Sequence, residues 1–281
     1  MEEDKDQPLA GSDSTDLKLV QRRARRFMGK ELEIPDGVGA ETFEDIGILA
    51  GPELVSPTSP MPEATKRSEN IRTRLLDVAE FLFARWGYTG VSVRDVSDLS
   101  ETRLGSVNYY FGSKQNLYLA VWERRSAILS KARMDAMQKA IDSDLTGVPF
   151  IAELADAYMM PAVEFSENGG PGWRSFFQLI GHVTFSRLWP NQILHYFNSP
   201  AERFVEGLKT RYPDISDFQA QAISLLLVGP VIYILARTGR IETFSAPAFG
   251  SDDLDRLVPE AHHFIVGGIC GSLGLRYERE T

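Results

Sequence analysis

The stretch between Ile71 and Leu117 constrains the fold most, because its apolar residues and turn signals follow the pattern of three short, closely spaced helices. Four apolar residues repeat along one face of the first helix: Ile71, Leu75, Val78 and Leu82. Gly87 is expected to end this helix, because glycine readily adopts the left-handed conformation of a helix end. Ser92 suits the N-cap of a second helix. A third helix is predicted over residues 104–110.

The third predicted helix and its flanks are rich in side chains that can bind nucleic acid. Arginine suits guanine and asparagine suits adenine in the major groove, and an apolar side chain such as Leu104 can meet a thymine methyl. Arg94 and Lys114 lie near helix N-termini, where backbone donors also favour phosphate. The candidate DNA contacts are Arg94, Thr102, Arg103, Leu104, Ser106, Asn108, Tyr109, Tyr110 and Lys114. For Tyr110, a place in the core is an equally good interpretation.

Two runs, FARWGYTGVSVRDV and GSVNYYFGSKQNLY, resemble the DNA-binding domain of the TetR (tetracycline-repressor, AcrR-like) family of transcriptional regulators. The resemblance covers about a sixth of the chain. It implies an all-α homodimer, with an N-terminal helix-turn-helix domain and a C-terminal helical domain for effector binding and dimerisation. It also implies that Arg103, Asn108 and Tyr109 face the DNA groove or its walls, with Leu104 and Ser106, whereas Val107 and Phe111 face the core.

The chain departs from the family pattern in the turn before the third helix. Glu101 stands where the family has a glycine that permits a positive φ. A non-glycine residue there costs about 1 kcal/mol, unless the turn is reshaped. Arg103 replaces a capping serine, so Thr102 or Ser100 is expected to cap the third helix.

Charge is distributed unevenly along the 281 residues, whose net charge is −9. Residues 67–139 carry 12 basic and 8 acidic side chains and are the basic segment of the chain, as contact with phosphate requires. The acidic remainder is expected to stay away from DNA. Residues 1–66 read as a mostly disordered extension. Their arginine cluster between Leu17 and Leu32 either adds DNA affinity or is simply solvated.

The remainder of the chain, residues 114–281, is predicted to be helical. Ser113 can cap a fourth helix that reaches about residue 141, with Leu117, Val121 and Ile128 on one face. Further helices are expected near 150–167, 171–187, 190–211, 215–239 and 252–275, with Pro161 and Pro230 kinking or interrupting theirs. The longest apolar run, residues 223–236, is interpreted as a buried helix, not a membrane span. Without a secretory signal, the expected location is the cytoplasm.

Aromatic residues gather in the C-terminal region, where the family resemblance implies an effector pocket. Such a pocket suits a hydrophobic or aromatic small molecule, with His182 as a polar anchor. The candidate effector contacts are Tyr158, Phe165, Trp173, Phe177, His182, Phe185 and Tyr196. The alternative is that these aromatic residues are core. The resemblance also implies a four-helix dimer bundle from the last two helices, where Gly267 and Gly271 share one face.

Catalytic and metal-binding signatures are not found. The four histidines show no metal spacing, and no phosphate loop or nucleophile elbow is present, so neither catalysis nor a cofactor is expected. The sequence predicts a cytoplasmic, homodimeric regulator, most simply a repressor. A small molecule would release it from an inverted-repeat DNA operator. The alternative is a helical adaptor, or an enzyme, with a degenerate helix-turn-helix.

Overall fold

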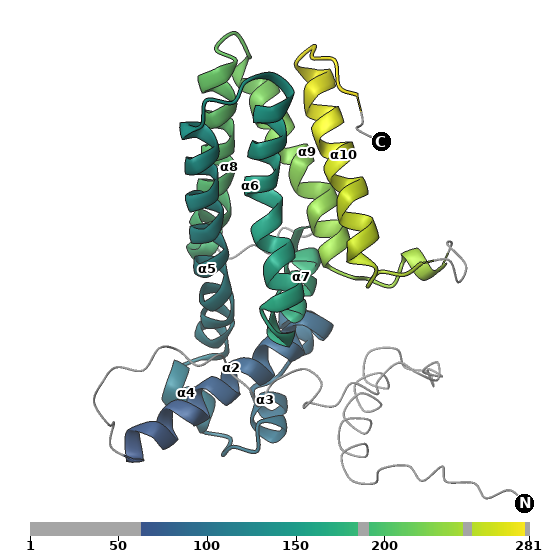
Figure 1. Cartoon of the computed structure of the whole chain (residues 1–281). Helices are drawn as coiled ribbons and strands as arrows, with labels where there is room; N and C mark the ends of the chain where they lie inside the picture. The colour runs from purple at the N-terminus through teal and green to yellow at the C-terminus, as the bar shows by residue number, and fades with distance from the viewer. Residues whose placement is uncertain (1–62, 185–190, 244–248, 279–281) are drawn as a thin grey trace, which may run out of the picture. The chain divides into compact units, whose positions relative to one another are not determined.

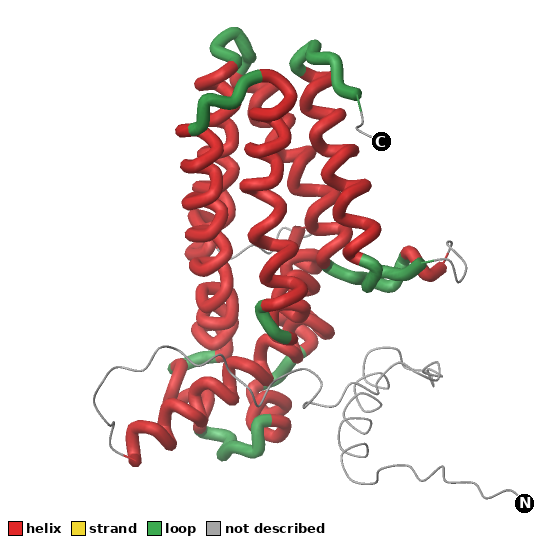
Figure 2. Tube along the Cα trace, in the orientation of Figure 1, coloured by secondary structure: helices red, strands yellow, loops and turns green. Residues whose placement is uncertain are grey.

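A computed structural model describes residues 63–184, 191–243 and 249–278. All of the described residues belong to one compact unit within Glu53–Thr281. The expectations for the N-terminal extension therefore lie outside the described residues. Within those residues the chain forms helices, turns and loops with no strand, which confirms the predicted all-α class (Figures 1 and 2).

The first three described helices form the predicted helix-turn-helix. They are α2 (Glu63–Gly90), α3 (Val93–Leu99) and α4 (Ser106–Phe111). Gly87 breaks the helical geometry of α2 with φ 63° and ψ 176°, as its sequence position predicted. Leu75, Val78 and Leu82 are buried on one face of α2, whereas Ile71 is half-buried. The predicted apolar face is therefore confirmed.

Six further helices follow, close to their predicted ranges. They are α5 (Lys114–Asp142), α6 (Gly147–Asn168), α7 (Pro171–Thr184), α8 (Leu194–Arg211), α9 (Asp217–Leu235) and α10 (Leu254–Ser272). Two 3-10 turns, η1 (Asn191–Ile193) and η2 (Ile241–Thr243), precede α8 and α10. Helices α6 and α9 continue through Pro161 and Pro230, so neither proline interrupts its helix.

Helix α5 connects the helix-turn-helix to the later helices. It packs on α2 and α4 near its start and on α6 and α8 along its length (Figure 1). Ser113 caps it as predicted, accepting a hydrogen bond from the Asn116 amide. Leu117 and Val121 are buried, but the prediction for Ile128 is wrong, since it is 48% exposed. The buried stripe of α5 runs instead through Ser126 and Leu129, beside Ile128.

A buried group of charges connects α2 to α5. The carboxylate of Glu80, on α2, accepts hydrogen bonds from Arg124 Nη2 at 2.5 Å and from Arg125 Nε at 2.5 Å. Arg124 also donates to Asp77 at 2.6 Å. Burial raises the pKa of the Asp77 carboxyl, and Arg124 opposes that rise. Burial alone would lower the pKa of Arg124, but Glu80 and Asp77 outweigh it and raise the pKa.

The N-terminal end of α7 covers this charge cluster. A Cβ atom on Gly172 would lie 1.9 Å from Arg125 Nη2 and 2.8 Å from Glu80 Oε2, so a larger residue there would displace the side chains of this ion pair. The Arg125 guanidinium also lies 5.1 Å from the centre of the Trp173 ring, at cation–π distance. Helices α2, α5 and α7 therefore meet around one buried carboxylate.

Replacing Glu80 with glutamine should destabilise the protein, because Arg125 loses its buried counter-charge and Arg124 keeps only Asp77. Loss of one partner from a buried pair costs about 3–5 kcal/mol, and we expect about 2–3 kcal/mol here because both arginines are partly exposed. The measurement is chemical denaturation. The control is Asp135→Asn, in the exposed Lys131–Asp135 pair, which should cost no more than about 0.5 kcal/mol. Equal losses in the two variants would contradict the role given to Glu80.

Candidate DNA-binding surface and ligand cavity

Local hydrogen bonds set the start of α3. Ser92 Oγ accepts from the Asp95 amide at 3.2 Å, and the Asp95 carboxylate accepts from the Ser92 amide at 2.7 Å. This reciprocal capping box satisfies two amide donors that would otherwise lack partners. The prediction that Ser92 caps the second helix is confirmed, and Arg94 is exposed in the first turn of α3.

The turn between α3 and α4 keeps the left-handed residue that the family pattern requires. Glu101 has φ 51°, and the Thr102 amide donates to the Ser97 carbonyl at 2.9 Å. Arg74, on α2, donates to the Glu101 carbonyl at 3.2 Å. Of the two expectations for Glu101, the structure therefore has the strained positive φ and not a reshaped turn.

The predicted cap of α4 is wrong. Its N-cap is Gly105, which provides no side-chain hydrogen bond. The two expected caps instead face each other, with Ser100 Oγ and Thr102 Oγ1 3.0 Å apart. The Ser106 amide bonds to the Arg103 carbonyl at 2.8 Å, so a backbone turn replaces the side-chain cap.

Helix α4 has one buried face and one exposed face. Val107 and Phe111 are buried, as predicted. Tyr109 is 82% exposed and Leu104 57% exposed, and the side chains of Arg103 and Asn108 are exposed as well. Thr102, Ser106 and Tyr110 are half-buried beside this exposed face.

Lys114 begins α5, next to the DNA-binding candidates of α4. Its ammonium nitrogen lies 4.1 Å from the centre of the Tyr88 ring, a contact that holds the charge near the end of α4. Together α3, α4 and the start of α5 present arginine, lysine, asparagine and tyrosine side chains that can contact bases and phosphate.

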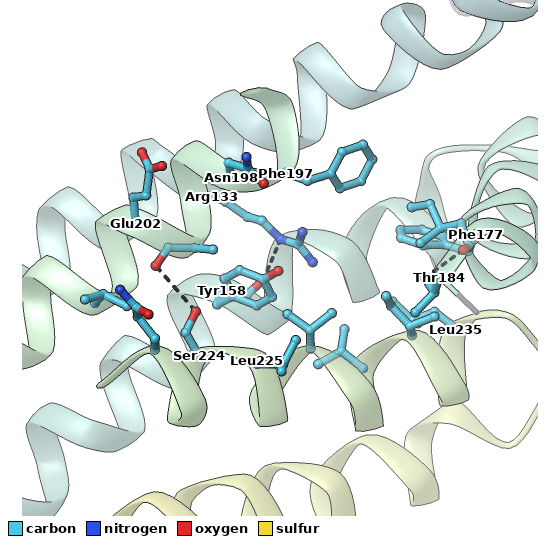
Figure 3. A pocket seen from close by; sticks show the side chains of 17 residues that line it. Arg133, Tyr158, Phe177, Thr184, Phe197, Asn198, Glu202, Ser224, Leu225 and Leu235 are labelled. Atoms are coloured by element: carbon cyan, nitrogen blue, oxygen red, sulfur yellow. Dashed lines mark hydrogen bonds between the residues drawn. The ribbon is translucent and has the colours of Figure 1, made fainter. Parts of the chain in front are cut away.

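A cavity of about 760 Å³ lies among α5, α6, α7, α8 and α9. Its lining is mostly aliphatic and aromatic, and includes Phe177, Phe197 and Leu235 (Figure 3). Arg133 and Tyr158 also line it, and Arg133 Nε donates to the Tyr158 carbonyl at 2.8 Å. Burial lowers the pKa of the Arg133 guanidinium, which the Tyr158 side chain partly opposes.

The cavity brings together two of the seven candidate effector residues, Tyr158 and Phe177. Phe165 and Trp173 instead stack on each other, with ring centres 4.3 Å apart. His182 lines a separate surface hollow, and Tyr196 lies against His195. Phe185 is outside the described residues.

Arg133 was missed by the sequence reasoning, although the sequence contains a signal for it. The buried row of α5 runs through Leu129, Arg133, Met137 and Ala140, so one charged residue interrupts apolar positions at helical spacing. Buried arginines are rare unless they are paired, and such an interruption indicates a functional position.

Helices α9 and α10 have an exposed apolar face. The prediction that residues 223–236 form a buried helix therefore holds for only one side of α9, where Ile223, Leu227 and Val231 are buried. Leu225 and Leu226 of α9 are 74% and 71% exposed, and Phe264 of α10 is 73% exposed. By length and composition alone, α9 is also apolar enough to cross a membrane. Gly267 lies against the Tyr277 ring, whereas the space beside Gly271 is open.

Within the described residues, no group of side chains could hold a metal ion.

The left-handed conformation of Glu101 predicts that glycine is preferred there. Glu101→Gly should give a free energy of unfolding about 1 kcal/mol higher than Glu101→Ala, because alanine keeps the steric cost at positive φ. Both variants remove the carboxylate, so charge is matched between them. Chemical denaturation measures the difference. Equal stability of the alanine and glycine variants would mean that the conformation is not strained.

Comparison with known proteins gives a family match for the N-terminal described helices and another for the later helices. The family model "Bacterial regulatory proteins, tetR family" matches residues 75–121, and "Tetracyclin repressor-like, C-terminal domain" matches residues 156–268. An uncharacterized HTH-type transcriptional regulator of Lactococcus lactis is 32% identical over 79 residues, covering 28% of this chain and 40% of that protein. The HTH-type transcriptional repressor NicS of Pseudomonas putida is 26% identical over 94 residues, covering 34% and 44%. The chain thus matches less than half the length of each of these relatives.

The fold has a counterpart among solved structures. A TetR-like transcriptional regulator from Rhodococcus sp. superposes with a TM-score of 0.50 and 16% identity, covering 75% of this chain and all of that one. Such a likeness concerns the fold alone. The two family models, which match residues 75–121 and 156–268, show that the chain belongs to the TetR family of bacterial regulatory proteins.

Proposed function

We propose that this protein is a sequence-specific DNA-binding transcriptional repressor, released from its operator by a small molecule bound in the cavity. The observation that carries the proposal is the exposed surface of α4 and of the turn before it, where Asn108 and Tyr109 of the helix and Arg103 of the turn are available to base edges. This face belongs to the basic segment of an otherwise acidic chain.

The exposed side chains have separate roles in this proposal. Asn108 reads a base, because an amide can bond in a bidentate manner to adenine. Arg94 and Lys114 hold the phosphate backbone and fix the register of α4 in the groove. The conformation of Glu101 supports an intact helix-turn-helix rather than a degenerate one, since the turn keeps the positive φ of the family's glycine.

Residues 67–113 would act as the DNA-binding domain and residues 114–281 as the ligand-binding and dimerisation domain. Extensive packing of α2 on α5 and α7 supports a close mechanical connection between the two. We also propose a cytoplasmic location, where operator DNA is found.

The exposed apolar face of α9 and α10 supports a homodimer. Leu225, Leu226 and Phe264 line a shared hollow between these helices, and exposed clusters of large apolar residues mark interaction surfaces. A symmetric dimer would present two copies of α4 to successive turns of an inverted repeat.

Asn108→Ala and Arg94→Ala should affect DNA binding differently. The first should cost about 1–3 kcal/mol at particular base pairs, and the second should weaken binding to all duplexes alike. Fluorescence anisotropy, with a duplex that the protein retains from a random-sequence pool and a scrambled duplex, measures both. For the wild-type protein, log affinity should fall linearly with log salt.

If Asn108→Ala kept the wild-type preference for the selected over the scrambled duplex, the base-reading role of Asn108 would be excluded. If the wild-type protein retained no sequence from the pool above background, the proposed function itself would be wrong.

Phe264→Glu should convert the dimer to a monomer, because two carboxylates would be buried in a symmetric apolar interface. Sedimentation velocity measures the oligomeric state. Ile128→Glu is the control, since Ile128 is an exposed apolar residue of α5, a helix that does not pack on α10. It should remain dimeric. A dimer that persists in Phe264→Glu at the wild-type concentration would place the interface elsewhere.

A further inference from the structure

Arg133 is a charged side chain buried inside an apolar cavity. It is 6% exposed, and its guanidinium carbon lies 4.0 Å from the centre of the Tyr158 ring. Figure 3 shows the guanidinium among the side chains of Tyr158, Phe197 and Asn198. Its Nε is used by the Tyr158 carbonyl, which leaves the four N–H donors of the two terminal nitrogens for other partners.

No carboxylate of the described residues pairs with this guanidinium. Glu202 is the one acidic side chain among the residues that line the cavity, and it is exposed and makes no ion pair with Arg133. Arg124 and Arg125, on the same helix, are in contrast both paired with Glu80. Arg133 is therefore a buried cation without a counter-charge in the described part of the chain.

A buried charge without a partner is unfavourable, and arginine cannot relieve it by losing its proton. An anion in the cavity would supply the missing charge. The two terminal nitrogens form a planar fork, which matches the two oxygens of a carboxylate. One buried cation in a mostly apolar lining calls for one negative charge on a mostly apolar molecule.

We propose that the cavity binds a monocarboxylate with an apolar body. The carboxylate accepts hydrogen bonds from the terminal nitrogens of Arg133, and the apolar body lies along Ile180, Val228, Val231 and Leu235. The volume of about 760 Å³ is within the ordinary range for small-molecule sites. This refines the hydrophobic or aromatic effector expected from the sequence. The carboxylate site itself does not depend on the proposed function. Only the identification of this ligand as the effector rests on that proposal.

Calorimetric titration of the full chain tests the proposal with two pairs of probes: octanoate against 1-octanol, and 2-naphthoate against 2-naphthalenemethanol. At pH 7 the members of each pair differ in charge but share an apolar body. For at least one pair, the wild-type protein should bind the acid about tenfold or more tighter than the alcohol, as expected for a charge-assisted hydrogen bond. Arg133→Met should reduce this ratio to about one while leaving affinity for the alcohol within about threefold.

Arg203→Met is the matched control, because Arg203 lies on α8 and is paired with Glu206 on the surface. It should keep the wild-type ratio. Arg133→Met removes no partner from an ion pair, so its melting temperature should not fall below that of the wild type. If the variant nevertheless failed to fold, the acid-to-alcohol ratio of the wild-type protein alone would decide the question.

Wild-type protein that binds neither acid better than its alcohol would overturn the proposal, as would an Arg133→Met variant that keeps the wild-type ratio. The anisotropy measurement with DNA is independent of both. Failure of carboxylate binding with DNA binding intact would reject this inference alone, and carboxylate binding without DNA binding would reject the proposed repressor alone.

Discussion

The buried carboxylate of Glu80 is the contact on which the arrangement of the described helices depends. It holds Arg124 and Arg125 of α5 against α2, and Gly172 lets the start of α7 close over the three side chains. The helices of the DNA-binding surface are attached to the same elements, since α3 packs on α2 and α4 packs on α5. The position of α4 is therefore set by the relation among α2, α5 and α7, and a buried charge that loses its partner is costly enough to keep that relation fixed.

The ligand cavity is connected to this junction by the same two helices. Arg133 lies eight residues beyond Arg125 on α5, about 12 Å along the helix axis. Phe177 lines the cavity from α7, whose first turn covers Glu80. We infer that a ligand drawn to Arg133 and Phe177 acts on both helices at once. If α5 and α7 can pack against α2 in two arrangements, a ligand that binds one arrangement more tightly favours it. The position of α4 would change with that arrangement.

Local signals in the sequence predicted local structure well. Gly87 breaks the helical geometry through its positive φ, and Ser92 and Ser113 begin helices through side-chain hydrogen bonds; the structure confirms all three. Glu101 adopts the positive φ expected of the glycine it replaces. The predicted cap of α4 was a local expectation that failed. The other expectations that failed depend on tertiary packing. The exposure of Ile128 and of the α9 face could not be read from periodicity, because an apolar stripe does not show which part of it meets a neighbour. The aromatic residues divide between the cavity and the core for the same reason: Trp173 and Phe177 are four positions apart on α7, yet only Phe177 lines the cavity.

The most direct test of the account is whether the cavity and the DNA-binding surface are coupled. DNA affinity of the wild-type protein should be measured by anisotropy with and without a saturating amount of the probe carboxylate that binds more tightly. The account predicts that the carboxylate weakens DNA binding by about 5–150-fold, and that saturating DNA weakens carboxylate binding by the same factor, because linkage is reciprocal. Identical DNA affinity with and without the bound carboxylate would contradict the account.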